Sequence, residues 1–557
     1  MSLQFITGNS GNGKTKYLFN RIVKEAKANP RDNYLVIVPE QFTMQTQRQL
    51  VDLSENKAIM NIDVLSFKRL AYRVFDELGI TNLTVLEETG KNLVLRKLAA
   101  QEADKLGVIG RNLNRIGYIS EVKSLLSELV QYNISPEELG RYIASGRLSD
   151  TLSDKLKDVL VLYEAFEKFM QDKYITAEEI LNVLSNVAEE SAILRNSVIA
   201  FDEFTGFTPI QNQLIKKLFV ISKKIYVTLT IDCREDIFKS RGMQELFDMP
   251  KRTVKSLTEM AAFYGIEVEE PIILDKNYRL AENEELSFME QQLFRKRRCS
   301  FKKVPKHIHI DCLRDPKQEL TKIARRINEL VRNENLRYRD IAIVTGDVNI
   351  YAGYVREIFD KYNIPYFIDA TQEILFHPFI EFIRSIPDIA AQHFSADAVF
   401  RFLRCGFSEL LDSEIDVLEN YVLACGVRGK SAWDKKWVRL PKHKAGYDLE
   451  LLNQSREYIM ELLKPVYQVF SDKKSTVKDY VLAIYKLIVL LDIPDKLAKK
   501  EQVLLDAGDQ TASKEYGQIY KIVMQLFEKY VSVLGDECMD AEEFTQILDA
   551  GLDAADV

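Results

Sequence analysis

The sequence comprises 557 residues, of which 46% are hydrophobic and 29% charged, and its formal net charge is -7 at pH 7. The length predicts about three or four domains. The sequence has no apolar run near the roughly 20 residues that cross a bilayer and no signal-peptide pattern, which predicts a cytoplasmic protein without a membrane partner. Its six cysteines lack C-x-x-C spacing, which indicates neither a disulfide framework nor a cysteine-based metal site. The negative charge leaves any nucleic-acid contact to local basic patches.

A glycine-rich loop lies near the N-terminus, between an apolar strand pattern at 3–7 and a helical pattern at 16–28. Glycines let backbone N–H groups face a polyphosphate, and the following helix presents its positive end. Lys14 can reach the β and γ oxygens, and Thr15 can ligate Mg²⁺. The loop therefore predicts an ATP·Mg²⁺ site; a glycine-rich turn that carries a lysine is the alternative. The residues that fit G-x-x-x-x-G-K-[ST] are Gly8, Asn9, Ser10, Gly11, Asn12, Gly13, Lys14 and Thr15.

Strand and helix patterns alternate at the start of the chain, which is typical of a parallel, doubly wound sheet. From about residue 83 the apolar residues recur at helical spacing, and Ser135 and Thr176 resemble helix caps, each with a glutamate three residues later. We therefore expect a sheet domain at 1–82 and 196–300, with an all-helical insertion at 83–195. The predicted strands lie at 3–6, 34–38, 62–65, 197–201 and 225–231.

A second α/β series follows at 301–377, and from 378 to 557 the pattern is again helical. No later strands complete this second sheet, and the chain stops in mid-pattern, so we expect a fragment of a longer protein with a second helical insertion at 378–557. The predicted strands of the second series lie at 307–312, 341–345 and 366–368, and its predicted helices at 317–331 and 351–362.

Adjacent carboxylates, Asp202 and Glu203, end the apolar strand at 199–201. At such a position one carboxylate can hold Mg²⁺, together with Thr15, and the other can orient the attacking water. A solvated acidic turn is the alternative, but the combination with a phosphate loop favours a second element of a nucleotide site. Arg279 can reach a γ-phosphate, although an arginine on a surface loop is as easily neutral.

Two stretches have the chemistry of nucleic-acid contacts. Arg297 and Arg298 belong to a basic run without acidic residues, which can neutralise phosphates or serve as a solvated linker. Trp433 and Trp437, the only two tryptophans, lie four residues apart among cations. They can stack on bases, or they can fill the core side of a helix, which is the interpretation that we favour.

Three blocks near the N-terminus, in order, closely resemble the start of the AddB family of bacterial helicase-nuclease subunits. They are Gly8 to Lys16, Val38 to Thr43 and Val64 to Val74. The likeness covers essentially the whole chain. It continues through Phe204 to Pro209, Asn363 to Asp369, His377 to Arg384 and Leu418 to Tyr421.

The resemblance implies a UvrD-like, superfamily-one helicase fold: an α/β, helix-rich chain with two RecA-like domains, each with a helical insertion. It also implies a heterodimer with an AddA-type subunit that resects double-stranded DNA for recombinational repair, with AddB scanning single-stranded DNA for the Chi signal. The nuclease domain and its iron-sulfur cluster are expected in a missing C-terminal half.

By analogy with such helicases, the segments 41–43 and 66–69 are expected to contact the backbone of the DNA strand. Ordinary polarity of loops and helix caps also explains these residues. Glu203 departs from the family pattern, which leaves open whether ATP is hydrolysed or only bound. A scanning scaffold and an unrelated P-loop ATPase remain the alternatives. The residues expected at the DNA backbone are Gln41, Thr43, Ser66, Lys68 and Arg69.

Overall fold

A computed structural model describes residues 1–80, 85–108, 110, 118–145, 148–170, 174–295, 299–369, 374, 376–441, 447–472 and 474–553. It consists of two compact units. Unit 1 comprises residues 1–86, 126–139 and 170–311, and unit 2 comprises residues 87–125, 140–169 and 312–557.

Unit 1 contains a parallel sheet in the order β3-β2-β6-β7-β1-β8, and β9 also pairs with β1. The four central strands fall where the sequence predicts them, and all pairings are parallel, as the alternation of strands and helices indicates. The strands are β1 (Ser2–Gly8), β2 (Tyr34–Ile37), β3 (Ile62–Leu65), β6 (Val198–Phe201), β7 (Lys224–Thr230), β8 (Glu267–Val268) and β9 (Ile272–Leu274).

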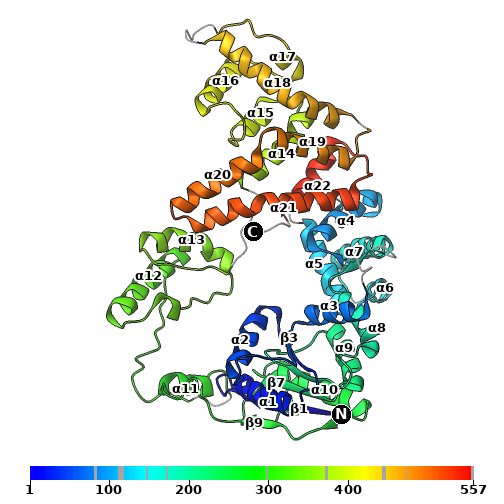
Figure 1. The fold of residues 1–557 in the computed structure, drawn as a ribbon, viewed down its shortest axis with the longest axis vertical. Coiled ribbons are helices and arrows are strands. Elements are labelled where there is room, and N and C mark those ends of the chain that lie inside the picture. Colours follow the sequence, from blue (N-terminus) through cyan, green and yellow to red (C-terminus); the bar gives the residue numbers. More distant parts are fainter. Residues whose placement is uncertain are drawn as a thin grey trace. The chain divides into compact units, whose positions relative to one another are not determined.

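Helices cover both faces of this sheet (Figure 1). Successive side chains of a strand point to opposite faces, so Leu35 and Ile37 belong to one buried cluster while Val36 belongs to the other. This is why the strands are apolar throughout rather than alternating. One face is covered by α1 (Lys14–Ala28) and α2 (Thr43–Leu53). The other is covered by α3 (Phe67–Leu78), α8 (Ile180–Val187), α9 (Pro209–Ile221) and α10 (Asp248–Phe263).

The expected all-helical insertion contains one short exception. β4 (Val85–Leu86) and β5 (Ile175–Thr176) form a two-residue parallel pair. Neither β4, β5, β8 nor β9 was predicted, because two or three residues are too few to show a period. Ser135 accepts from the Glu138 N–H at the start of α6 (Pro136–Ala144), as its sequence predicts. Thr176 and Glu179 bond reciprocally, but α8 begins only at Ile180. Two further helices of this insertion are α5 (Tyr118–Gln131) and α7 (Asp150–Met170). Outside it, α11 (Glu284–Gln292) follows β9.

Unit 2 is helical, and most of its buried side chains form one large cluster. Within it the long helices α20 and α21 lie side by side (Figure 1). In the described part of the chain, no helix is long and apolar enough to cross a membrane. Besides α7, α12 (Pro316–Asn333) and α13 (Val348–Lys361), the helices of unit 2 include α4 (Glu88–Gln101), α14 (Pro378–Ala391), α15 (Ala396–Leu403), α16 (Asp412–Cys425), α17 (Lys430–Asp434), α18 (Leu449–Ser471), α19 (Val477–Leu490), α20 (Ile493–Asp506), α21 (Gln510–Leu534) and α22 (Ala541–Asp553).

The second α/β series is only half formed. α12 (Pro316–Asn333) and α13 (Val348–Lys361) match the predicted helices and share a small buried cluster. The predicted strands at 307–312, 341–345 and 366–368 are wrong: their described residues carry no strand. Ile310, Val344 and Phe367 are 94%, 93% and 88% exposed. A strand exists only through ladder bonds to a neighbour, so a strand-like pattern without a partner stays an irregular segment.

Candidate functional site

The glycine-rich loop connects β1 to α1, as the sequence predicts. Gly13 has a left-handed backbone, with φ of 80°, and the helix starts at the next residue. A Cβ atom on Gly8 would lie 2.6 Å from the Leu274 carbonyl oxygen. The glycines are therefore required by backbone conformation at Gly13 and by close approach of β9 at Gly8.

Lys14 lies over the loop that it belongs to. Its Nζ donates to the Gly8 carbonyl at 3.1 Å and to the Asn9 carbonyl at 3.0 Å. Burial lowers the pKa of the Lys14 ammonium, while Glu203 and Asp202 oppose that effect. Carbonyl oxygens are weaker partners for an ammonium than phosphate oxygens, so the side chain is suited to exchange them for an anionic ligand.

The strand-end carboxylates meet the hydroxyl of Thr15. Thr15 Oγ1 lies 3.3 Å from Asp202 Oδ1 and 3.3 Å from Glu203 Oε1. Asp202 is 1% exposed and also accepts from Thr228. Glu203 is exposed and has a left-handed backbone, with φ of 63°. Such strain in a residue other than glycine is typical of functional sites.

Asp202 has one carboxylate oxygen to spare. Burial raises the pKa of its carboxyl group, and the neighbouring Glu203 adds to that effect. Among the described residues, Oδ2 of Asp202 has no hydrogen-bond partner. Buried polar atoms are rarely left so. Together with the Thr15 hydroxyl, this oxygen forms the hard donor set that Mg²⁺ prefers.

These groups line a cavity of about 740 Å³. It opens at the carboxyl ends of β1, β6 and β7, the edge at which parallel sheets bind ligands. The structure thus brings Lys14, Thr15, Asp202, Glu203 and Arg279 to one cavity, and their roles in binding and catalysis stay predictions. It also adds residues that the sequence analysis missed, namely Gln45, Thr46, Gln49, Thr228 and Tyr278.

A signal for Thr228 was present in the sequence. Successive side chains of β7 point to opposite faces, so Tyr226, Thr228 and Thr230 share one side of the strand. Threonines in an otherwise apolar strand indicate a polar environment on that side. Tyr278 stands beside the predicted Arg279, and its ring would lie 3.6 Å from a Cβ atom on Gly13. No local pattern identifies that approach.

The residues expected at the DNA backbone leave β2 and β3, which are neighbours in the sheet. Thr43 and Ser66 are buried and make local bonds: the Thr43 hydroxyl donates to the Glu40 carbonyl, and Ser66 accepts from the Arg69 N–H. Their hydroxyls therefore serve the ends of helices. Gln41, Lys68 and Arg69 are exposed.

The interpretation of the tryptophans as a base-stacking platform is wrong, and the core interpretation is confirmed. Trp433 is 0% and Trp437 7% exposed, and their rings meet edge to face at 5.2 Å. Trp437 Nε1 donates to the Ala432 carbonyl at 3.0 Å. No ring face remains for a base. Arg297 and Arg298 lie outside the described residues.

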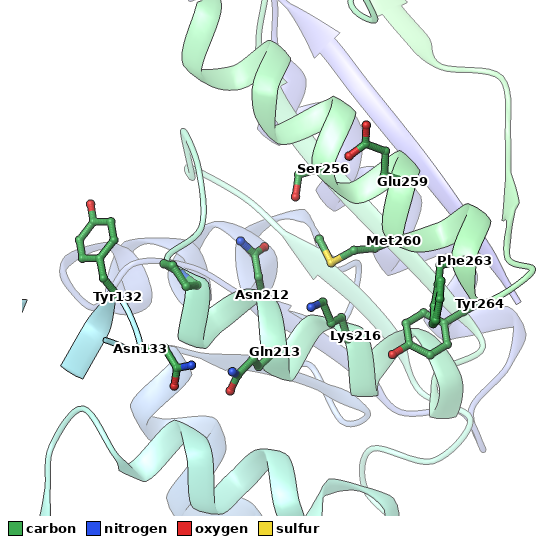
Figure 2. A pocket seen from close by; sticks show the side chains of 11 residues that line it. Tyr132, Asn133, Asn212, Gln213, Lys216, Ser256, Glu259, Met260, Phe263 and Tyr264 are labelled. Atoms are coloured by element: carbon green, nitrogen blue, oxygen red, sulfur yellow. The ribbon is translucent and has the colours of Figure 1, made fainter. Parts of the chain in front are cut away.

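A second hollow, of about 580 Å³, lies between α9 and α10 in the same unit. Figure 2 shows Asn212, Gln213 and Lys216 of α9 facing Ser256 and Met260 of α10, with Tyr132 at one end and Phe263 and Tyr264 at the other. It contains none of the residues predicted to bind nucleotide, metal or DNA.

Comparison with known proteins gives one consistent result. Residues 5–290 match the family described as the N-terminal part of ADDB. This range contains the glycine-rich loop at 8–15, both strand-end carboxylates and Arg279.

Similarity to individual proteins extends over the whole chain. Each of the following relatives bears the name of an ATP-dependent helicase/deoxyribonuclease subunit of the B type. The protein of Lachnoclostridium phytofermentans is 38% identical over 100% of the chain and 49% of the relative. That of Clostridium acetobutylicum is 32% identical over 99% of the chain and 48% of the relative. That of Clostridioides difficile is 31% identical over 99% and 49%. The chain thus spans about half the length of the curated relatives that it matches.

Proposed function

Because the chain belongs to the ADDB N-terminal family, we propose that it is the helicase-like part of a subunit of an ATP-dependent helicase/nuclease. In this proposal it binds ATP and single-stranded DNA while the complex resects double-strand breaks for recombinational repair. The observation that carries the proposal is the shared cavity of Lys14, Thr15, Asp202, Glu203 and Arg279. A phosphate loop with two carboxylates and an arginine is the set of groups that polyphosphate chemistry needs.

Each group has a role in binding a triphosphate. Backbone N–H groups of the loop and the positive end of α1 attract phosphate oxygens. The Lys14 ammonium leaves the Gly8 and Asn9 carbonyls for the phosphates. Arg279 is directed at the loop, since its Nη1 lies 3.4 Å from Ser10 Oγ, and it adds a second cation.

Thr15 and Asp202 are the residues that would hold Mg²⁺. The Thr15 hydroxyl and the Oδ2 atom of Asp202 are oxygen donors that suit this ion, which would neutralise charge on the phosphate oxygens. Glu203 faces the same space and can accept a proton from, or orient, an attacking water. Hydrolysis of ATP by this chain therefore belongs to the proposal.

A nucleotide-binding scaffold that scans DNA without hydrolysis is the second candidate. The strained backbone of Glu203 favours hydrolysis over this candidate, because strain is retained where a side chain must be aimed. Phosphate release stimulated by single-stranded DNA, and lost in a Glu203→Gln variant that still binds ATP, separates the two.

DNA binding, Chi scanning, the AddA-type partner and a cytoplasmic location are further parts of the proposal. They are supported by the family, and DNA binding also by the exposed Gln41, Lys68 and Arg69, which follow the neighbouring strands β2 and β3. The division into domains at 1–82 with 196–300, 83–195, 301–377 and 378–557 also remains a proposal. We also propose that the nuclease activity in the relatives' name belongs to the part of them that this chain does not match.

Calorimetric titration with ATP in millimolar Mg²⁺ tests nucleotide binding. Lys14→Ala should weaken binding at least tenfold, because it removes a charged hydrogen-bond donor from the phosphates. Lys24→Ala is the matched control, since Lys24 is an exposed lysine on the same helix, outside the cavity. Equal affinities of the wild type and Lys14→Ala would contradict the proposal.

A further inference from the structure

The segment that follows β9 closes the outer side of the phosphate loop. β9 pairs with β1 up to Gly8, which lies opposite Leu274. Asn12 Nδ2 then donates to the Leu274 carbonyl at 2.6 Å, and the Tyr278 N–H donates to the Gly11 carbonyl at 2.9 Å. The loop is therefore held by a chain segment that is distant in sequence as well as by its own helix.

Asn277 makes the central contacts of this closure. Its Nδ2 donates to the Ser10 carbonyl at 2.9 Å, and its Oδ1 accepts from the Leu280 N–H at 3.0 Å. One amide side chain thus joins the loop to the turn that carries Arg279. The fit is close, since a Cβ atom on Gly11 would lie 2.8 Å from Asn277 Oδ1.

The direction of these bonds matters for phosphate binding. In a planar trans peptide the carbonyl and the N–H point in opposite directions. A side chain that fixes the Ser10 carbonyl therefore also fixes the Gly11 N–H, on the side away from Asn277. The same side chain holds the turn from which Arg279 reaches Ser10 Oγ.

We propose that Asn277 is a positioning residue of the nucleotide site: through Ser10 and Leu280 it fixes the phosphate loop and Arg279 relative to each other. The proposal rests on the nucleotide binding proposed above. Asn277 does not act on the nucleotide directly, since it is not among the residues that line the cavity.

The test is an ATP and ADP titration of Asn277→Ala, Arg279→Ala and the double variant in the 557-residue chain. Loss of the hydrogen bond to the loop should weaken ATP binding about threefold to tenfold. Because Arg279 is predicted to face the γ-phosphate, both single variants should also lower the ratio of ATP to ADP affinity. The loss of ATP affinity in the double variant should be smaller than the product of the two single-variant losses, because both substitutions disturb the same arrangement of loop and arginine.

Asp275→Ala is the matched control, since it shortens an exposed side chain of the same segment that lies outside the cavity. It should change ATP affinity less than twofold. Without nucleotide, Asn277→Ala should unfold within about 2 °C of the wild type, whereas a merely structural role would lower that temperature and leave the ATP to ADP ratio unchanged.

The outcomes separate the two proposals. Two results would overturn the role of Asn277 if Lys14→Ala still loses ATP binding. One is that Asn277→Ala keeps the wild-type ATP affinity and ATP to ADP ratio. The other is that the double variant loses affinity by the full product of the single-variant losses. Nucleotide binding that is indifferent to Lys14 would overturn the proposed function and, with it, this inference.

Discussion

Gly11 occupies a position where both the backbone and the neighbours exclude a side chain. Its φ of 87° is left-handed, and a Cβ atom would lie 2.8 Å from the Cβ of Arg279. L-residues adopt this conformation at a cost of roughly 1–2 kcal/mol. Conformation and crowding therefore act together at this residue.

Gly11→Ala should abolish most nucleotide binding and lower the free energy of unfolding by about 2 kcal/mol or more, because the added methyl group must displace the segment at 277–279. Urea denaturation and calorimetric titration measure the two effects. Gly79→Ala is the control: its φ is 69°, and nothing lies within 4 Å of the added atom. Gly79→Ala should lower the free energy of unfolding only by the cost of the left-handed backbone and leave nucleotide binding intact. Equal effects of the two substitutions would show that crowding is unimportant.

Asp202 contributes unfavourably to stability at neutral pH. Burial raises the pKa of its carboxyl group in the folded protein above the value in the unfolded chain. The folded state therefore binds this proton more tightly. The stabilisation that comes from this tighter proton binding is fully present below the ordinary pKa of aspartate. It is lost as the pH rises through the higher pKa of the folded protein.

Asp202→Asn should raise the unfolding temperature of the nucleotide-free protein at pH 8, by about 2–4 °C for roughly 1 kcal/mol in a domain of this size. An asparagine can keep the Oδ1 contacts and place its amide where Oδ2 has no partner. The gain should shrink at pH 5, where more of the wild-type carboxyl is protonated. Calorimetric scans at both pH values measure it, and a gain independent of pH would contradict the assigned cause. The same variant should lose Mg²⁺-dependent nucleotide binding.

Helix α17 and the segment after it show how the surroundings decide the role of an aromatic side chain. Trp433 and Trp437 are the only tryptophans of the chain, and both lie in the core of unit 2. Arg456, which is buried, donates to the Trp433 carbonyl at 2.9 Å and fixes the segment further.

Tryptophan fluorescence should therefore show a blue-shifted emission that acrylamide quenches weakly and that single-stranded DNA leaves unchanged, since base stacking requires an exposed ring. Titration with an oligonucleotide at low salt checks this. Trp437→Phe should retain DNA affinity while losing stability, because it removes a buried ring and its hydrogen bond. Strong quenching by the oligonucleotide would restore the stacking hypothesis.

Some of the elements could be predicted from the sequence because their signals are local. The central strands are long apolar runs with helices between them, and the phosphate loop fits a fixed spacing. β8 and β9 could not be predicted, since they are short and exist through pairing with β1. The strand predicted at 307–312 is wrong because pairing is missing. Its sequence pattern is strand-like, but no strand among the described residues pairs with it.

Residues of the candidate site also differ in whether a local sequence pattern identifies them. Lys14, Thr15 and Asp202 are recognisable because each stands at a fixed place after a strand. Asn277 and Tyr278 acquire their importance from contacts with a loop 267 positions earlier, which no local pattern contains. The two tryptophans have the composition of a nucleic-acid site, and only their burial decides against it.

At the scale of the whole chain, segments with strand-like sequences differ in whether a neighbouring strand pairs with their backbone. The ladder between β1 and β7 is continuous over seven residues. The segments at 307–312, 341–345 and 366–368 have no ladder in the part of the chain that is described.

Hydrogen exchange followed by mass spectrometry should therefore show the slowest amides of unit 1 in β1, β6 and β7, and faster exchange in the three segments without a strand ladder. Saturating ATP·Mg²⁺ should slow exchange at 8–15 and at 275–280 together, because Asn277 joins these segments. Slow exchange at 341–345 without ligand would show that this segment is paired after all.

The parallel pairing of β9 with β1 also determines when, during synthesis, the glycine-rich loop at 8–15 gains its contacts with residues 274–279. Asn277 follows Ser10 by 267 positions, so at about 5–20 residues per second a ribosome delivers it roughly 10–50 s later. Until then the loop lacks the contacts that Asn277 and Tyr278 make with it. If the proposed function holds, nucleotide binding is consequently a late event for the nascent chain, and much of unit 1 can fold before a ligand binds.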